Sequence, residues 1–261
     1  MAASQDSPVV PIDLTHFGLR EMLRCGNAVR SAARGASCLE AAAQAIVSCL
    51  CQSLHHAAEA RSACVLVRAF VTRPLSTLDA EMQAAARSAA GDLPLPPDVN
   101  CLVLVATIGD EPAWCDRRLS AGHRVIPLLS AETVRGAPML ARLFEAFGIP
   151  IAALVGSADP ERLLHVTSGK TYGVFHVPEA RGSPYVPAQR DFVERYGVRS
   201  VLGFGASLVT GDLGAVIMFT RADISEEVAD RFRAIALELK GVLHRFGPGS
   251  IFAPPREGTA C

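Results

Sequence analysis

The chain has 261 residues and a formal net charge of −1, and 50% of its residues are hydrophobic. These values suit one large domain or two small ones with a sizeable core, and the charge gives no electrostatic reason to expect nucleic acid as a partner. No apolar run approaches the roughly 18 residues of a membrane helix, and residues 1–11 lack the pattern of a signal peptide. We therefore expect a cytoplasmic protein that binds neither nucleic acid nor membrane.

The first predicted element is a helix that ends near Ala33. A flexible tail of residues 1–12 precedes it, and Asp13 or Thr15 can supply its N-cap. The apolar residues expected on its buried face are Leu19, Met22, Leu23 and Val29.

A second helix and a strand–helix–strand unit follow. A capping box at residues 37–40 opens the second helix, which extends to about Ala58. The apolar runs 64–71 and 101–108 predict two buried strands, and the alanine-rich segment 79–90 predicts a helix between them.

The middle of the chain is less regular. Residues 137–147 and 187–196 predict two short helices. No internal repeat or break in composition supports two domains. We therefore expect one domain of residues 13–246, followed by a Gly/Pro-rich tail of residues 247–261.

The closing part of the chain predicts a hairpin and a long helix. Residues 198–209 alternate between apolar and small or polar side chains, a turn at residues 210–212 follows, and residues 213–220 are rich in β-formers. Ser225 caps a helix whose apolar residues recur at spacings of three and four: Val228, Phe232, Ile235, Leu239, Val242 and Phe246. A half-buried hairpin backed by an amphipathic helix predicts an α+β fold, with an antiparallel sheet and helices on one face.

This closing part also resembles a known family. Tyr196–Gly205, Thr210–Phe219 and the helix to about Lys240 resemble the second half of a GAF domain, and residues 170–189 share the resemblance. GAF domains are small-molecule-sensing modules, and the resemblance is to those at the N-terminus of bacterial signalling proteins, ahead of PAS, histidine kinase or cyclase domains. It covers most of residues 19–243. The resemblance implies a ligand pocket between the sheet and a set of covering loops.

The first candidate ligand-binding residues lie in that covering region. Tyr172, Phe175 and His176 occur in one short run, and Tyr185 follows. Aromatic walls with a few polar groups are typical of small-molecule sites. The alternative is a strand with alternating faces, on which His176 and Glu179 are simply solvated.

A second candidate cluster is Trp114, Arg117 and His123. A Trp with an Arg suits a flat or anionic ligand, because the guanidinium offers a planar fork of donors. The alternative is a loop anchored by the only Trp of the chain.

Haem is a further hypothesis for the cofactor, which the sequence otherwise leaves unknown. His123, His165 and His176 lie in the presumed covering region, without the close spacing of a metal-binding pair. A proximal haem histidine needs no second ligand, so one of them would suffice.

A thiol-dependent redox enzyme on a GAF fold is the alternative to a sensor. The eight cysteines have irregular spacings without a Cys-x-x-Cys pair, so we expect free and mostly buried thiols. Cys115 lies beside Arg117 and Arg118, which favours a reactive thiolate. No catalytic motif is present in the sequence, and we expect no enzymatic activity.

The terminal helices suggest how a bound ligand would be reported. The apolar seam of residues 228–246 and the first helix can pack on their own sheet or on a second chain. The resemblance implies a homodimer through these helices. Because the segment after residue 246 is too short for an effector, we expect a signalling partner protein.

Overall fold

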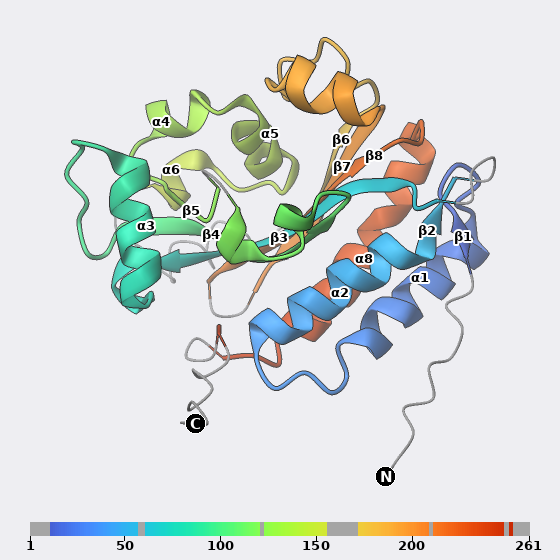
Figure 1. The fold of residues 1–261 in the computed structure, drawn as a ribbon. Helices are drawn as coiled ribbons and strands as arrows, with labels where there is room; N and C mark the ends of the chain where they lie inside the picture. Colours follow the sequence, from blue (N-terminus) through green and yellow to red (C-terminus); the bar gives the residue numbers. More distant parts are fainter. Residues whose placement is uncertain are drawn as a thin grey trace, which may run out of the picture.

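The central element is a six-stranded sheet in which every pair of neighbouring strands is antiparallel (Figure 1). The computed structural model describes residues 11–56, 61–120, 123–155, 172–208, 211–247 and 251–252. In spatial order the strands are β5 (Val125–Pro127), β4 (Asn100–Gly109), β3 (Cys64–Pro74), β8 (Leu213–Thr220), β7 (Ser200–Ser207) and β6 (Tyr172–Val177).

Two helices, α2 (Leu39–Ser53) and α8 (Glu226–Leu243), cover one face of this sheet, and α1 (Leu19–Ala32) packs on these two helices; we call the three together the helix layer. α2 packs mainly on β3 and β4, and α8 packs mainly on β6 and β7. α1 contacts both of these helices (Figure 1). The α+β prediction is therefore confirmed, including the helices on one face.

The other face carries a second layer, which we call the covering layer (Figure 1). The expected loops are partly short helices here: α4 (Ala131–Arg135), α5 (Pro138–Ala146), α6 (Ile151–Leu154) and a π-helical turn (Gln189–Glu194). The remaining short elements are β1 (Ile12–Asp13), β2 (Leu54–His55), α3 (Ala80–Ala90) and three 3-10 turns at Leu75–Thr77, Pro112–Trp114 and Arg117–Leu119.

The two layers bury the sheet on both faces. Every residue of β7 and β8 is buried, so the prediction of a half-buried hairpin is wrong. Leu202 and Phe204 belong to the core under the helix layer, whereas Val201 and Ile217 belong to the core under the covering layer. The strands therefore separate two hydrophobic cores.

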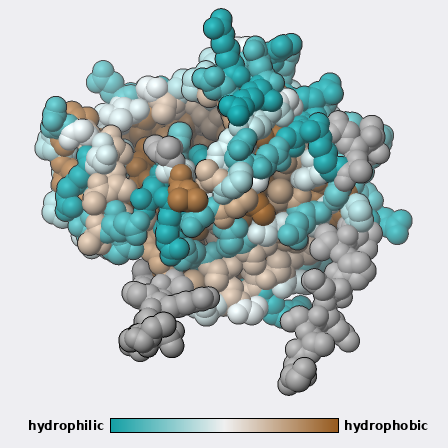
Figure 2. All heavy atoms as spheres, viewed as in Figure 1, coloured by the Kyte–Doolittle hydropathy of each residue, from teal (hydrophilic) through white to brown (hydrophobic). Residues whose placement is uncertain are grey.

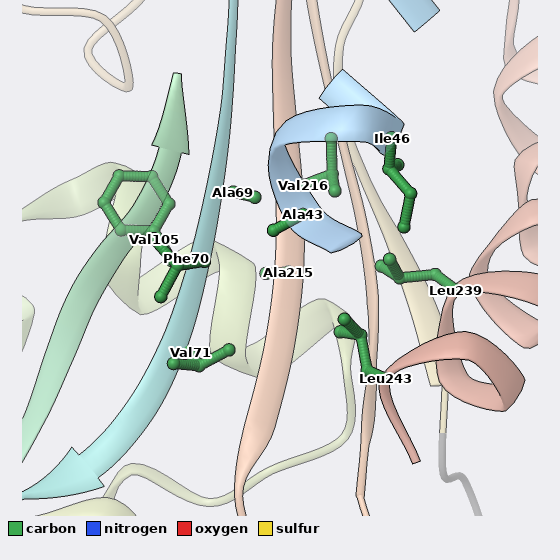
Figure 3. A pocket seen from close by; sticks show the side chains of 10 residues that line it. All are labelled: Ala43, Ile46, Ala69, Phe70, Val71, Val105, Ala215, Val216, Leu239 and Leu243. Carbon is green, nitrogen blue, oxygen red and sulfur yellow. The ribbon is translucent and has the colours of Figure 1, made fainter. Parts of the chain in front are cut away.

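The core under the helix layer is tightly packed. Figure 3 shows Ile46 of α2 and Leu239 and Leu243 of α8 directed toward the strands. The cavity that they line with strand residues has a volume of about 10 Å³. That is room for about one water molecule, so this layer offers no space for an organic ligand at this place.

The predicted start of α8 is confirmed. The Ser225 hydroxyl accepts a hydrogen bond from the Val228 amide at 3.3 Å, as an N-cap does. The whole predicted seam from Val228 to Phe246 is buried, with Phe246 just beyond the helix end. Acidic residues in the first turn and Lys240 in the last turn also suit the helix dipole.

The predicted caps of the first two helices are wrong. Asp13 instead accepts a hydrogen bond from the Thr15 amide at 2.9 Å in a local turn, and α1 begins after Gly18. α2 is capped by Cys38, whose Sγ accepts from the Ala41 amide at 3.4 Å, and the helix ends at Ser53.

The predicted buried face of α1 is also wrong in part. Leu19 and Leu23 are 68% and 63% exposed, whereas Cys25, Gly26 and Val29 are buried. Gly26 explains the rotation of the helix, because a Cβ atom there would lie 3.3 Å from Cγ of Glu238 in α8. Because residue 26 has no side chain, α1 can pack against α8 with Cys25, Gly26 and Val29 on its buried face.

The two predicted tails are described only in part. Ile12 is buried and pairs with Leu54, so the predicted flexible tail does not extend through residue 12. Ile251 is buried as well, and its carbonyl accepts a hydrogen bond from the Glu40 amide at 2.7 Å. Among the described helices, none combines the length and the apolar character needed to cross a lipid bilayer.

Candidate functional site

A groove of about 440 Å³ opens on the outer side of the covering layer, between α4, α5 and α6. In Figure 2, apolar side chains reach the surface in the region where Figure 1 shows these helices. The residues that line the groove are Arg135, Pro138, Ala141, Arg142, Glu145, Ile149, Pro150, Ile151 and Tyr185.

Local sequence explains why three short helices form here rather than one long one. Pro138 lies in the first turn of α5, where a missing amide hydrogen costs nothing. Gly148 ends the helix with φ = 69°, a backbone conformation that glycine adopts freely. Pro150 then precedes α6. The chain therefore reverses twice within a short distance and leaves the groove between the helices.

The ring of Tyr185 packs on the ring of Phe175 in the sheet. The two rings meet edge to face, with centroids 6.2 Å apart and planes at 86°. Phe175 comes from β6 and is only 1% exposed, whereas Tyr185 is half-buried at the groove. An edge-to-face pair fixes the orientation of both rings, so the Tyr185 ring is held in place beside the groove.

The rim of the groove carries two guanidinium groups and one carboxylate. Arg142 pairs with Glu145 at 2.7 Å, and their side chains are 50% and 69% exposed. The hydrogen bond to Glu145 raises the pKa of Arg142, and the nearby Tyr185 adds to this effect. Arg135 lies in the last turn of α4. The groove thus combines apolar walls with an excess of cationic donors, an arrangement suited to an amphipathic molecule with an acidic group.

The structure brings together only two of the four residues in the first candidate set. Phe175 and Tyr185 are in contact under the covering layer. Tyr172 and His176 lie on the other face of β6, because successive side chains of a strand point to opposite faces. The alternating strand weighed above therefore describes residues 172–177, and these residues do not line one pocket.

His176 lies against the segment that leads into α8. Its ring hydrogen-bonds the backbone of Ile224, while its Nε2 atom is buried without a hydrogen-bond partner. Burial lowers the pKa of His176, and this effect outweighs the Ile224 backbone and the Glu226 carboxylate, which both raise it. The ring faces the packed helix layer, so its surroundings do not suit an axial ligand of haem.

The second candidate cluster is divided in the structure. The Trp114 ring packs on Tyr196 at 4.7 Å and on Phe192 at 5.6 Å. Arg117 instead donates to Glu40 of α2 at 2.5 Å and lies 4.2 Å above the ring of Phe252. These contacts favour the alternative in which the Trp anchors a loop.

The last of the predicted histidines and the candidate thiol lie at the surface. His123 is exposed. Cys115 is exposed too, and its Sγ donates to the Gly109 carbonyl at 3.4 Å. Because Arg117 is bound to Glu40, the structure places that cation in a salt bridge rather than beside the thiol. The described residues contain no group of three or more His, Cys, Asp or Glu side chains arranged for a metal, and His165 lies outside them.

The sequence interpretation missed Arg135 and Arg142. Both belong to short helices of five and nine residues, which carry little periodic signal. The sequence does indicate turns here, because helix-breaking residues occur at Pro138, Gly148 and Pro150.

Comparisons with known proteins add no assignment. A scan against protein-family models finds no match to this chain, and a search among curated proteins finds no significant match.

Proposed function

We propose that this chain is a small-molecule-sensing domain of the GAF type that binds its ligand in the groove beside Tyr185. The observation that carries the proposal is the groove itself, whose volume of about 440 Å³ lies within the usual range of ligand sites. Its apolar walls suit the body of the ligand, and Arg135 and Arg142 suit an acidic or polar end.

The path from the groove to the helix layer is short. Tyr185 contacts Phe175, and Phe175 belongs to β6, on whose other face α8 packs. A ligand that fixes Tyr185 in one position would bias the packing of β6 on α8 if the two arrangements bind it with different affinity. In this proposal α8 carries the signal.

The proposal includes a homodimer and a signalling partner that meet the helix layer. Leu19 and Leu23 of α1 and Leu237 of α8 are large apolar side chains exposed to solvent, at 68%, 63% and 46%. Leu19 and Leu23 are neighbours on one face of α1, since they are four residues apart, and adjacent exposed apolar side chains are typical of contact surfaces. A cytoplasmic location fits the seven described cysteines, all of which are free thiols.

The test is a titration with 8-anilinonaphthalene-1-sulfonate, a fluorescent molecule with an apolar body and an acidic group. We expect saturable binding that Tyr185→Ala and Arg142→Ala each weaken about tenfold, a loss of about 1.4 kcal/mol. Near-UV circular dichroism must show that the variants keep their tertiary packing, since the same dye binds partly unfolded proteins.

Tyr172→Ala is the matched control, because this tyrosine lies in the same hairpin on the opposite face of β6. It should leave the affinity unchanged. Equal weakening by Tyr172→Ala and Tyr185→Ala, or no weakening by either groove variant, would remove the groove as the ligand site. Native mass spectrometry of the purified protein would then be used to identify a natural ligand that stays bound.

A further inference from the structure

Arg68 is a half-buried cation in the middle of the sheet, on the face under the covering layer. It lies in β3, where its neighbours in register are Thr107 of β4 and Ile217 of β8. Its Nη2 donates to the Ser120 hydroxyl at 3.2 Å, and its Nε is buried without a hydrogen-bond partner. Within the described residues, no carboxylate forms a salt bridge with it. Burial lowers the pKa of Arg68, as expected for a cation without a compensating charge.

Thr107 adds a second unsatisfied group beside it. Thr107 is fully buried, and its Oγ1 has no hydrogen-bond partner. Its backbone is satisfied, because Gln44 of α2 donates to the carbonyl at 3.2 Å and accepts from the amide at 3.3 Å. Cross-strand partners project to the same face of a sheet. The hydroxyl of Thr107 and the side chain of Arg68 are therefore neighbours.

Polar groups surround this pair. β5 pairs only with residues 101–103 of β4, so no strand of the described residues lies beside the edge of β4 near Thr107. A 3-10 turn covers that edge, and its Ser120 amide donates to the Arg117 carbonyl at 3.3 Å. Arg117 is held by Glu40, one helical turn before Gln44, and its Nη1 is also buried without a partner.

Another arginine of the same strand shows how this fold pairs a buried cation. Arg73 is 1% exposed and forms a salt bridge with Asp212 at the turn between β7 and β8, although its Nε and Nη2 are also buried without hydrogen-bond partners. The difference from Arg68 is therefore the carboxylate. Most buried polar groups in native proteins have a partner, and a buried charge without one is destabilising. The lack of a carboxylate for Arg68, next to an unsatisfied hydroxyl, thus points to a partner that is not part of the described chain.

We propose that Arg68, Thr107 and Ser120 form a binding site for an oxyanion, the carboxylate or phosphate group of a small molecule. The guanidinium offers a planar fork that matches either group, and the Thr107 and Ser120 hydroxyls can donate to its remaining oxygens. The site is separate from the groove beside Tyr185, because Phe175 lies three strands away from Arg68 along the register β3–β8–β7–β6. It stands or falls independently of the proposed function.

The first experiment measures the thermal unfolding midpoint with sodium phosphate or sodium acetate, against sodium chloride at equal ionic strength. Binding to the folded state alone raises the midpoint. We expect one of the two oxyanions to raise it more for the native sequence and for the control Arg87→Met than for Arg68→Met, because Arg87 is exposed on α3 and belongs to neither candidate site. A larger response to acetate assigns a carboxylate ligand, and a larger response to phosphate assigns a phosphate. Equal midpoints in both oxyanions and in chloride would overturn the proposal, as would a response of Arg68→Met as large as that of the native sequence.

A second measurement separates a binding residue from a structural one. Without added oxyanion, Arg68→Met should raise the unfolding midpoint, since it replaces an uncompensated cation with an apolar side chain of similar length. Arg73→Met should lower it, because it breaks the buried salt bridge with Asp212. Thr107→Val should raise it as well, because the change removes an unsatisfied hydroxyl. A fall in the midpoint for Arg68→Met as large as that for Arg73→Met would assign Arg68 to the fold and overturn the proposal.

Discussion

Gly205 of β7 lies so close to Gly214 of β8 that a Cβ atom at residue 205 would be 2.3 Å from the Gly214 carbonyl oxygen. It would also lie 2.9 Å from the Phe147 ring of the covering layer. Since both obstacles belong to packed elements, the backbone would have to move. The glycine therefore allows the hairpin and the covering layer to approach each other.

Gly205→Ala should lower the free energy of unfolding by about 3 kcal/mol, the upper range for an overpacked core. Chemical denaturation with urea measures this value. Gly241→Ala is the control, because no atom lies within 4 Å of the added methyl group and the residue is in α8. There the free energy should rise by up to about 1 kcal/mol, since alanine favours the helix. A neutral Gly205→Ala would contradict the close packing of this hairpin.

Asp212→Asn should lower the free energy of unfolding by about 3–5 kcal/mol, because it leaves Arg73 buried without an opposite charge. The matched control is Asp223→Asn, which breaks a salt bridge with Arg199 in which both side chains are more than half exposed. An exposed pair contributes less than about 1 kcal/mol. Equal losses for the two variants in urea denaturation would show that the Arg73 pair is not shielded from water.

Stability should fall as the pH drops below the unfolded-state pKa of histidine, which is about 6.5. Burial lowers the pKa of His176 in the folded protein, so the unfolded chain binds a proton more readily in this range. The contribution of His176 is complete above pH ~6.5 and is lost as the pH falls toward its folded-state pKa. His176→Gln should reduce the slope of unfolding free energy between pH 7.5 and about 5, whereas replacement of the exposed His244 should not. An unchanged slope in His176→Gln would show that this ring is already solvated.

Among the seven described cysteines, Cys115 should react first with a maleimide reagent in the native protein. It is exposed, whereas Cys25 and Cys101 are buried, and burial raises the pKa of each of these two thiols to about 12. Only the thiolate is a good nucleophile, so these buried residues should react only after unfolding. Peptide mapping by mass spectrometry measures each site separately. Labelling of Cys25 as fast as Cys115 would contradict the described packing of α1.

The parts of the fold that could be predicted from the sequence are the long periodic ones. α8 has apolar residues at helical spacing along its whole length, and β3 and β4 are almost continuously apolar. The predicted bounds of all three agree with the structure within a few residues. The start of α1 was predicted wrongly, because Asp13 and Thr15 bond to each other in a local turn and do not cap the helix. Propensity alone cannot distinguish these two uses of the same side chains.

The candidate sites were harder to predict, because they depend on which strand face each residue occupies. Phe175 and His176 are adjacent in sequence but lie on opposite faces of β6. Arg135 and Tyr185 are far apart in sequence but line one groove. Arg68 did have a visible signal, a charged residue within an otherwise apolar run. That no carboxylate among the described residues pairs with it depends on tertiary contacts and emerges only from the fold.

The burial of β7 and β8 on both faces has a consequence for how these strands find each other. Where one face meets water, a slip by one residue exposes apolar side chains, and that penalty selects the correct alignment. With every position buried, this penalty is weak, and alignment depends on local shape such as the Gly205 contact and the Ser200–Thr220 hydroxyl pair at 2.9 Å. Damage at these few points would therefore favour misaligned and aggregating chains over a merely looser native state.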